Sequence, residues 1–373
     1  MKADPGYIET ENLLEALEKR LTKEYTKAEK ELEAKWRDYL RRFEIKDKRW
    51  REWVATGEKT ADEYKKWRTG QIAIGKRWEE MRDTAAQDLH NVNEIARSIT
   101  YGYMPEVYAI NHNYGTFEVE SGSGVDTSYT LYNRETVERL MRDNPEVLPG
   151  PGKKVSRRIS QGLDVRWNRQ QLQGVVMQSI LQGESIPAMA TRLSKEVGEK
   201  NRKAAVRNAR TMATGVQNAG RVDSYRRAVA LGIQMEQEWV ATLDMRTRHE
   251  HRQLDGQVRP VGEVFIVPST GEELAYPGDP RAPGHLIYNC RCTLAAKVAG
   301  YEDMSGQDPD LSKIEGMTYE KWKESKIEKP NPILLPEEKQ EAIKQSYINE
   351  YRNVSKKRKD KKKREKQKNG RRQ

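Results

Sequence analysis

The chain has 373 residues, enough for two or three domains. Charged residues make up 34% and hydrophobic residues 35% of it, which predicts much exposed helix rather than packed interior. Its two cysteines, separated by one residue, exclude a disulfide framework and predict a reducing compartment. No apolar run has the length of a membrane span, and the start lacks the features of a signal peptide, so we expect a soluble, non-secreted protein without a membrane partner.

The net charge of +11 is concentrated in one segment, residues 356–372. This segment lacks apolar and aromatic residues, so we expect it to stay disordered when free and to bind DNA without sequence preference. A solvated helix extension that only improves solubility is the alternative interpretation. The predicted DNA-binding residues are Lys356, Lys357, Arg358, Lys359, Lys361, Lys362, Lys363, Arg364, Lys366, Lys368, Arg371 and Arg372.

Two long apolar stripes dominate the N-terminal third. The first runs from Leu14 to Phe43 in steps of three and four residues, which predicts one helix that reaches about Trp53. Gly57 ends this helix, and Thr60 with Glu63 forms a capping box for the next. The second stripe continues to Ile99, so the sequence predicts an antiparallel helical hairpin. The hairpin is either an arm that docks on a partner or two helices that bury each other.

The composition changes after the second stripe. Residues 101–133 are rich in Tyr, Asn, Gly and Ser, which predicts a β-hairpin or a surface loop, and a short helix follows over 134–142. The Pro-Gly-Pro-Gly run at 149–152 predicts a domain boundary. We therefore expect three domains, a helical arm at 1–150, a compact domain at 151–300, and a linker, helix and basic tail at 301–373.

The segment after the linker is predicted to be helical up to residue 231. One helix covers about 156–181, Ser185 caps a second that Gly198 ends, and a third spans about 201–231. Four small residues in the third helix predict that another backbone packs closely against it. They are Ala213, Gly215, Ala219 and Gly220.

Short strands and turns follow. We expect strands at 238–243, 263–267 and 286–294, a turn at 277–280, and helices near 319–325 and 337–354. In the third strand, period two puts Leu286, Tyr288, Cys290, Cys292 and Leu294 on one face. The predicted fold class is a mostly α-helical α+β protein: a long N-terminal helical hairpin, a helical segment, a small mixed α/β domain and a disordered or helical tail.

The stretch from Trp239 to Thr293 carries several motifs in a fixed order, which makes a chance match improbable. The motif residues are Trp239, Asp244, Arg246, Arg248, His251, Asp255, Gly256, Pro277, Gly278, Asp279, Asn289, Cys290, Arg291 and Cys292. This order resembles the phage Mu F-like minor head protein family, and the preceding helix with Asn218 and Arg221 is similar to the family's lead-in segment. The resemblance covers roughly residues 200 to 298, about a quarter of the chain.

The resemblance implies a structural, non-enzymatic role without a required cofactor. It implies a minor capsid component at the portal vertex of a tailed-phage head that assists head morphogenesis, DNA packaging or DNA delivery. The implied partners are the portal protein and the capsid or scaffolding protein, and the charge of the basic tail adds phage double-stranded DNA as a further expected partner. The implied locations are the virion and, during assembly, the host cytoplasm.

The histidines and cysteines of this stretch allow two interpretations. His249, His251, His285, Cys290 and Cys292 offer the nitrogen and sulfur ligands of a structural zinc site, for which we favour His251, His285 and the two cysteines. Alternatively, the cysteines are small buried hydrophobic side chains that only pack. The spacing differs from the common Cys-x-x-Cys knuckle, and packing is the favoured interpretation.

A metal-dependent nuclease is the alternative function from a different class. Asp244 and His251 would handle a metal or a proton, and Arg246 and Arg248 would hold phosphate. The simpler interpretation is a turn in which Asp244 accepts from one of these two arginines. We assign Asn289 and the Asp255-Gly256 pair to turns and backbone hydrogen bonding.

Overall fold

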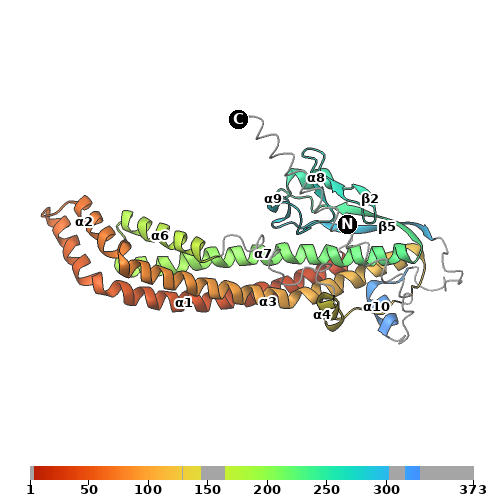
Figure 1. Ribbon diagram of the computed structural model, residues 1–373, viewed down its shortest axis with the longest axis horizontal. Coiled ribbons are helices and arrows are strands. Elements are labelled where there is room, and N and C mark those ends of the chain that lie inside the picture. The colour runs from red at the N-terminus through yellow and green to blue at the C-terminus, as the bar shows by residue number, and fades with distance from the viewer. Residues whose placement is uncertain (1–3, 128, 144–163, 302–315, 328–373) are drawn as a thin grey trace. The chain divides into compact units, whose positions relative to one another are not determined.

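The computed structural model describes residues 4–127, 129–143, 164–301 and 316–327, and it is mostly helical with a few small antiparallel strands (Figure 1). The chain forms two compact units. The helical unit comprises residues 11–103 and 156–212, and the motif unit comprises residues 1–10, 104–155 and 213–373. Neither unit is one continuous stretch, because three long helices contribute residues to both.

The first apolar stripe forms the predicted helix, α1 (Pro5–Thr56). All nine stripe residues are buried: Leu14, Leu17, Leu21, Tyr25, Ala28, Leu32, Trp36, Tyr39 and Phe43. Gly57 ends the helix with φ of 78°, a backbone conformation that glycine adopts easily. The capping box is confirmed, because the Thr60 hydroxyl accepts from Glu63 N while the Glu63 carboxylate accepts from Thr60 N at 2.9 Å.

The second stripe is not one helix. It comprises α2 (Ala61–Arg68), the π-helical turn η1 (Thr69–Ala73) and α3 (Lys76–Ser123). At the interruption Ile74 is extended and exposed, and Gly75 has φ of 97°. The prediction of an unbroken second helix is therefore wrong at this point, because the two extended or left-handed residues break the ladder of backbone hydrogen bonds.

The core of the helical unit contains more than the two predicted helices. α6 (Val165–Leu181) and the first half of α7 (Ile186–Ala230) run beside α1 and α3 (Figure 1). Their buried residues, such as Leu172 and Leu193, cluster with those of α1 and α3. A buried polar chain also links the four helices. Tyr25 Oη donates to Asn93, Asn93 to Asn201, and Asn201 to Asn168, over 2.6, 2.8 and 2.9 Å.

α7 is a single helix of 45 residues, so the predicted end at Gly198 is wrong. Ser185 does cap its start, because its hydroxyl accepts from Ala188 N at 3.3 Å. Gly198 has a packing role instead, since a Cβ atom there would lie 2.4 Å from Cγ of Glu29 on α1. Glycine inside a helix permits such close contact at a cost in helix propensity.

The prediction of a β-hairpin or loop at 101–133 is wrong over residues 101–123, where α3 continues to Ser123. Tertiary burial explains the difference, because this part of α3 buries Asn111, His112, Thr116 and Glu120 and satisfies them with hydrogen bonds. The predicted short helix is confirmed as α4 (Arg134–Asp143). The Pro-Gly run at 149–152 and the predicted helix start at 156–163 lie outside the described residues.

The motif unit contains a three-stranded antiparallel sheet in the order β2-β1-β5. Its strands are β1 (Ile233–Val240), β2 (Val258–Pro260) and β5 (Thr293–Tyr301), with Trp239 opposite Leu294. A small second sheet pairs β3 (Phe265–Ile266) with β4 (Glu273–Leu274). Three short helices complete the unit: α8 (His249–Leu254), α9 (Gly284–Ile287) and α10 (Tyr319–Ile327).

The predicted helix near 319–325 and the predicted turn at 277–280 are confirmed, but two strand predictions need correction. β1 starts at Ile233 and ends at Val240, before the predicted end at 243. The range 286–294 is mostly not a strand, because it contains the end of α9 and Asn289 with φ of 53°. The predicted helix at 337–354 and the basic tail lie outside the described residues. None of the helices in the described ranges has an apolar stretch that could cross a membrane.

Candidate functional site

The motifs meet on a buried polar face of α7. Thr214, Asn218 and Arg221 follow each other at helical spacing and are buried. The Thr214 hydroxyl donates to the carbonyl of Cys290 at 2.8 Å. The Asn218 amide donates to the carbonyls of Pro277 and Cys292, and its oxygen accepts from Leu294 N at 3.0 Å. One asparagine therefore joins the Pro-Gly-Asp turn to the Asn-Cys-Arg-Cys-Thr segment.

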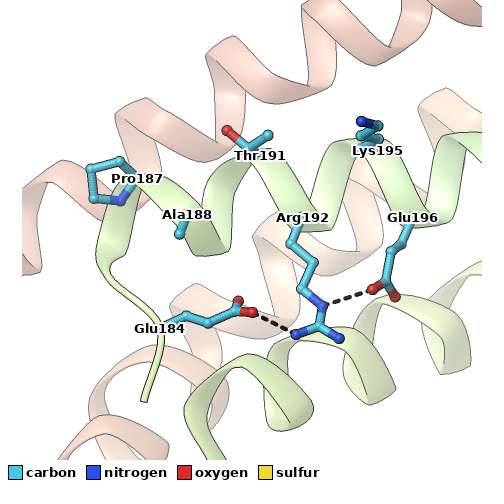
Figure 2. Close-up of a pocket in the computed structure, with 7 residues that line it drawn as sticks. All are labelled: Glu184, Pro187, Ala188, Thr191, Arg192, Lys195 and Glu196. Carbon is cyan, nitrogen blue, oxygen red and sulfur yellow. Dashed lines mark hydrogen bonds and ion pairs between the residues drawn. The ribbon is translucent and has the colours of Figure 1, made fainter. Parts of the chain in front are cut away.

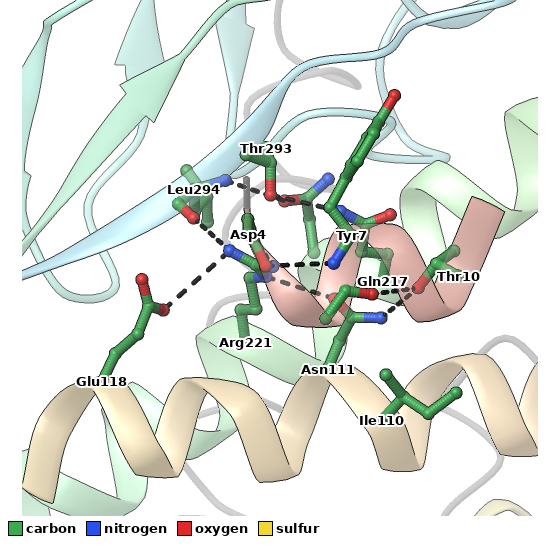
Figure 3. Close-up of polar contacts among 12 residues, drawn as sticks. Asp4, Tyr7, Thr10, Ile110, Asn111, Glu118, Gln217, Arg221, Thr293 and Leu294 are labelled. Atoms are coloured by element: carbon green, nitrogen blue, oxygen red, sulfur yellow. Dashed lines mark hydrogen bonds and ion pairs between the residues drawn. The ribbon is translucent and has the colours of Figure 1, made fainter. Parts of the chain in front are cut away.

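Arg221 extends this junction to the N-terminal segment (Figure 3). Its guanidinium donates to the carbonyl of Leu294 at 2.7 Å and to Asn111 Oδ1 at 3.3 Å, and it pairs with the Asp4 carboxylate. Burial would lower the pKa of Arg221, but the carboxylates of Asp4 and Glu118 outweigh burial and raise it above its usual value. Arg221 therefore stays charged inside the unit.

Glu118 is a further titratable group of this junction. It lies 3.9 Å from Arg221 and accepts from the Tyr225 hydroxyl at 2.8 Å. Burial raises the pKa of Glu118 to about 7, although Arg221 opposes the shift. Its side chain is 18% exposed, so it titrates in a site that water still reaches in part.

The predicted close approach to the small residues of α7 is confirmed. A Cβ atom on Gly215 would lie 2.6 Å from the carbonyl oxygen of Gly278 in the Pro-Gly-Asp turn. A Cβ atom on Gly220 would lie 2.8 Å from the carbonyl oxygen of Tyr108 on α3. Both glycines let a second backbone contact α7 directly.

Asp244 forms an ion pair, although its main partner differs from the prediction. Arg291 binds its carboxylate with two bonds of 2.7 Å, and this pair holds the pKa of Asp244 far below its usual value. The predicted contact with Arg246 is present but longer, at 3.8 Å, and Arg246 is largely exposed. Arg248 instead donates to the carbonyl of Tyr288. The four residues of the nuclease hypothesis are therefore each engaged in structural contacts.

The assignment of Asp255, Gly256 and Asn289 to turns is confirmed. Asp255 Oδ1 accepts from Ala241 N at 2.7 Å, and Gly256, with φ of 73°, donates its N–H to the carbonyl of Trp239. Asn289 is in the left-handed region. Asp279 also stabilises a turn, because it accepts from the backbone N–H groups of Ala275 and Arg281. These residues hold the turns that connect the strands.

His251, Cys290 and Cys292 form a buried cluster. Nδ1 of His251 lies 3.3 Å from Sγ of Cys292 and 3.6 Å from Sγ of Cys290. The opposite ring nitrogen, Nε2, lies 2.7 Å from the carbonyl oxygen of Leu286. Trp239, fully buried, packs edge-on against the His251 ring with 5.7 Å between ring centroids. The cluster therefore forms part of the core of the motif unit.

The pKa values of the two thiols in this cluster shift in opposite directions. A hydrogen bond from the Cys290 thiol, together with His251 and the Trp239 indole, lowers the pKa of Cys292 to about 5 against the effect of burial. The same bond and burial raise the pKa of Cys290 well above its usual value. The thiol of Cys292 is therefore the more acidic of the two.

The other predicted histidine ligand lies elsewhere. His285 is 61% exposed and contacts Glu272 at 3.2 Å, so it is not part of the cluster. His249 pairs with Gln253 on the exposed side of α8. The predicted set of His251, His285, Cys290 and Cys292 is thus reduced to three residues, because the short helix α9 turns His285 away from the sulfur atoms.

A surface groove lies in the helical unit, at the start of α7 (Figure 2). Three of its charged side chains pair with one another, since Arg192 contacts Glu184 at 2.6 Å and Glu196 at 2.7 Å. The other lining residues are Pro187, Ala188, Thr191 and Lys195. The Thr191 hydroxyl donates to Glu33 at 2.9 Å. We assign no chemistry to this groove because Arg192, Glu184 and Glu196 neutralise one another.

Sequence reasoning missed Asp4, Asn111 and Glu118 as members of the junction. They come from segments far from residues 239–293 in the sequence. One signal was available, because Thr214, Asn218 and Arg221 place polar side chains on the same helix as the small residues that indicate close packing. The twelve predicted DNA-binding residues of the tail lie outside the described residues.

Comparison with known proteins adds an independent line of evidence. Residues 170–295 match the family model described as Phage Mu protein F like protein. Minor head protein GP7 of Bacillus phage SPP1 is 26% identical over 292 residues, which cover 77% of this chain and 87% of that protein. No solved structure is significantly similar.

Two further curated relatives match this chain over less than half of their own length. The NAD(+)–arginine ADP-ribosyltransferase EFV of Enterococcus faecalis is 27% identical over 223 residues, 58% of this chain and 43% of that protein. An uncharacterized protein of Haemophilus influenzae is 27% identical over 224 residues, 59% of this chain and 43% of that protein. The chain thus spans less than half of the length of these two relatives.

Proposed function

Residues 170–295 carry a Mu F-like region, and from this premise we propose that the chain is a structural minor head protein of a tailed phage. The observation that carries the proposal is the match to minor head protein GP7, which extends over 87% of that protein. The match to the ADP-ribosyltransferase, by contrast, covers only 43% of that protein. The motif unit also supports a structural role, because its motif residues are used for turns, ion pairs and backbone hydrogen bonds.

We further propose that the protein acts at the portal vertex and binds the portal protein there, with the capsid or scaffolding protein as a second partner. It would reside in the host cytoplasm during assembly and in the virion afterwards. The test is a pull-down of the full chain with the portal protein of the same genome, combined with mass spectrometry of purified virions. Absence from complete heads would contradict the proposal.

A matched variant sharpens this test. Arg291→Gln removes the ion pair with Asp244, which has two hydrogen bonds, in the motif unit. Arg37→Gln removes an exposed ion pair with Glu33 in the helical unit. If the motif unit carries the contact, the first variant should weaken portal binding and the second should not. Equal binding by both variants would place the contact outside the Asp244 turn.

We also propose that residues 356–372 bind phage DNA without sequence preference and so assist DNA packaging or delivery. Support comes from charge alone, because twelve Lys and Arg residues lie among two acidic ones there. A chain that ends at Val354 should lose DNA affinity at low salt. For the full chain, log affinity should fall with log salt by about 0.9 per phosphate neutralised.

The control for the DNA test is a tail of the same length in which Gln replaces the twelve basic residues. It separates charge from length, and portal binding should survive in both altered chains. If the shortened and the full chain bind DNA equally, the DNA contact lies elsewhere and the tail serves solubility.

We propose that the chain has no catalytic activity. Among the described residues, those of the nuclease alternative do not form one site, because Asp244 is bound by Arg291 and His251 faces two sulfur atoms. Incubation with plasmid and Mg²⁺ or Mn²⁺ tests the nuclease, and incubation with labelled NAD⁺ tests the activity named for the transferase. Cleavage or transfer that survives purification to homogeneity would overturn the proposal.

A further inference from the structure

Three potential ligand atoms converge in the buried cluster around α8. Nδ1 of His251 and the Sγ atoms of Cys290 and Cys292 all lie within 4.8 Å of one another. A tetrahedral zinc ion with ordinary bond lengths separates its sulfur and nitrogen ligands by about 3.5 Å. The observed separations from Nδ1 are 3.3 and 3.6 Å, so both nitrogen–sulfur distances suit such an ion.

The surroundings orient these atoms as metal sites usually do. Nε2 of His251 donates to the carbonyl of Leu286 at 2.7 Å, which leaves the Nδ1 lone pair directed at the two sulfur atoms. The N–H of Cys292 donates to Sγ of Cys290 at 3.4 Å, a contact that stabilises a thiolate. The imidazole is therefore held in the tautomer that can bind a cation.

We propose that His251, Cys290 and Cys292 bind one thiophilic divalent cation, Zn²⁺, in the motif unit. Two thiolates and one imidazole suit a borderline-soft ion and disfavour Mg²⁺ and Ca²⁺, which prefer oxygen ligands. Within the described ranges no fourth His, Cys, Asp or Glu joins the cluster, so water or a small anion completes the tetrahedron.

The ion would connect two parts of the motif unit. His251 lies on α8, whereas the cysteines lie between α9 and β5, 39 and 41 residues further along the chain. A bond through the metal closes this loop and holds the Asn-Cys-Arg-Cys segment where Thr214 and Asn218 bind its carbonyls. The proposed ion is structural, and it is independent of whether the protein binds a portal.

The test uses the full chain purified without chelator from zinc-supplemented cells. Elemental analysis should find about one equivalent of zinc. Co²⁺ exchanged into the protein should give the visible absorption of a tetrahedral site with thiolate ligands. Cys290→Ser, Cys292→Ser and His251→Gln should each lower metal affinity by at least about tenfold. The matched control is His285→Gln, which removes a nearby histidine outside the cluster and should retain the metal.

A measurement on the unaltered chain keeps the test valid if a variant fails to fold. The two thiols should resist a thiol reagent in the metal-loaded protein and react after zinc is removed with a chelator. No bound metal after loading, or metal that persists in all three ligand variants, would overturn the proposal. A mass two units lower, from a bond between Cys290 and Cys292, would also overturn it by identifying a redox pair.

Discussion

A close backbone contact in the motif unit allows a test in which the sign of the change in stability decides the outcome. Gly215 lies in α7 against the Pro-Gly-Asp turn, and an added Cβ atom would lie 2.6 Å from the carbonyl oxygen of Gly278. Gly102 lies in α3, and a Cβ atom there has no heavy atom within 4 Å apart from its own helix backbone and chain neighbours. The same substitution, glycine to alanine, therefore adds a methyl group to a crowded position at Gly215 and to an open one at Gly102.

The magnitude follows from two opposing contributions. Alanine stabilises a helix interior by about 1 kcal/mol relative to glycine. At Gly102 this gain should appear almost in full. At Gly215 the turn backbone, which Asn218 holds through the carbonyl of Pro277, has to move. Overpacking of this kind costs about 1–3 kcal/mol. We expect a cost of about 3 kcal/mol here, because the neighbouring atom belongs to the backbone and cannot rotate away. Gly215→Ala should thus destabilise the motif unit by about 2 kcal/mol.

Thermal unfolding combined with regional hydrogen exchange measures both effects. A loss of 2 kcal/mol corresponds to a decrease in Tm of about 4–8 °C for a unit of this size. Faster exchange should be concentrated in β1 and β5 for Gly215→Ala, and Gly102→Ala should leave these strands unchanged. If Gly215→Ala is as stable as the unaltered protein, the turn does not pack against α7 as described, and the reasoning fails.

Three further predictions concern other contacts. Asp4→Asn should destabilise the motif unit by about 3 kcal/mol, because it leaves the buried Arg221 without its closest carboxylate, and urea unfolding at pH 7 measures this loss. Because the folded pKa of Glu118, about 7, exceeds its ordinary value of 4.5, stability should fall as pH rises from 4.5 to 7, and Glu118→Gln should flatten this part of the profile. A fragment of residues 11–103 should show little stable helix by circular dichroism until a second fragment of residues 164–212 supplies the rest of the core. If the first fragment is fully helical without the second, this prediction is wrong.

The sequence determined the helices whose apolar stripes are long and regular. The stripe from Leu14 to Phe43 has only one conformation that buries all its members on one face, and the structure has that conformation. Local signals with a direct physical cause also held, among them the Thr60 capping box and the left-handed Gly57. The motif order from Trp239 to Thr293 was sufficient to predict the family resemblance that the match over residues 170–295 supports.

Tertiary structure decided the elements whose local signals were ambiguous. Residues 101–123 look like a loop because Tyr, Asn and Gly are poor helix formers, yet they are helical because buried partners satisfy their side chains. Gly198 looks like a helix end but is a contact point for α1. Cys290 and Cys292 are both buried as predicted, but a turn with Asn289 in the left-handed region positions them instead of a strand.

The site shows the same division. Residue types allowed a cluster of nitrogen and sulfur ligands as the alternative to plain packing, but only the fold excludes His285 and brings His251 to the two thiols. Likewise, nothing in the spacing of Asp4, Asn111 and Arg221 indicates that they meet, because they are separated by more than one hundred residues. Local propensity and periodicity act over a few residues, whereas these contacts form only when distant segments bury their polar groups together.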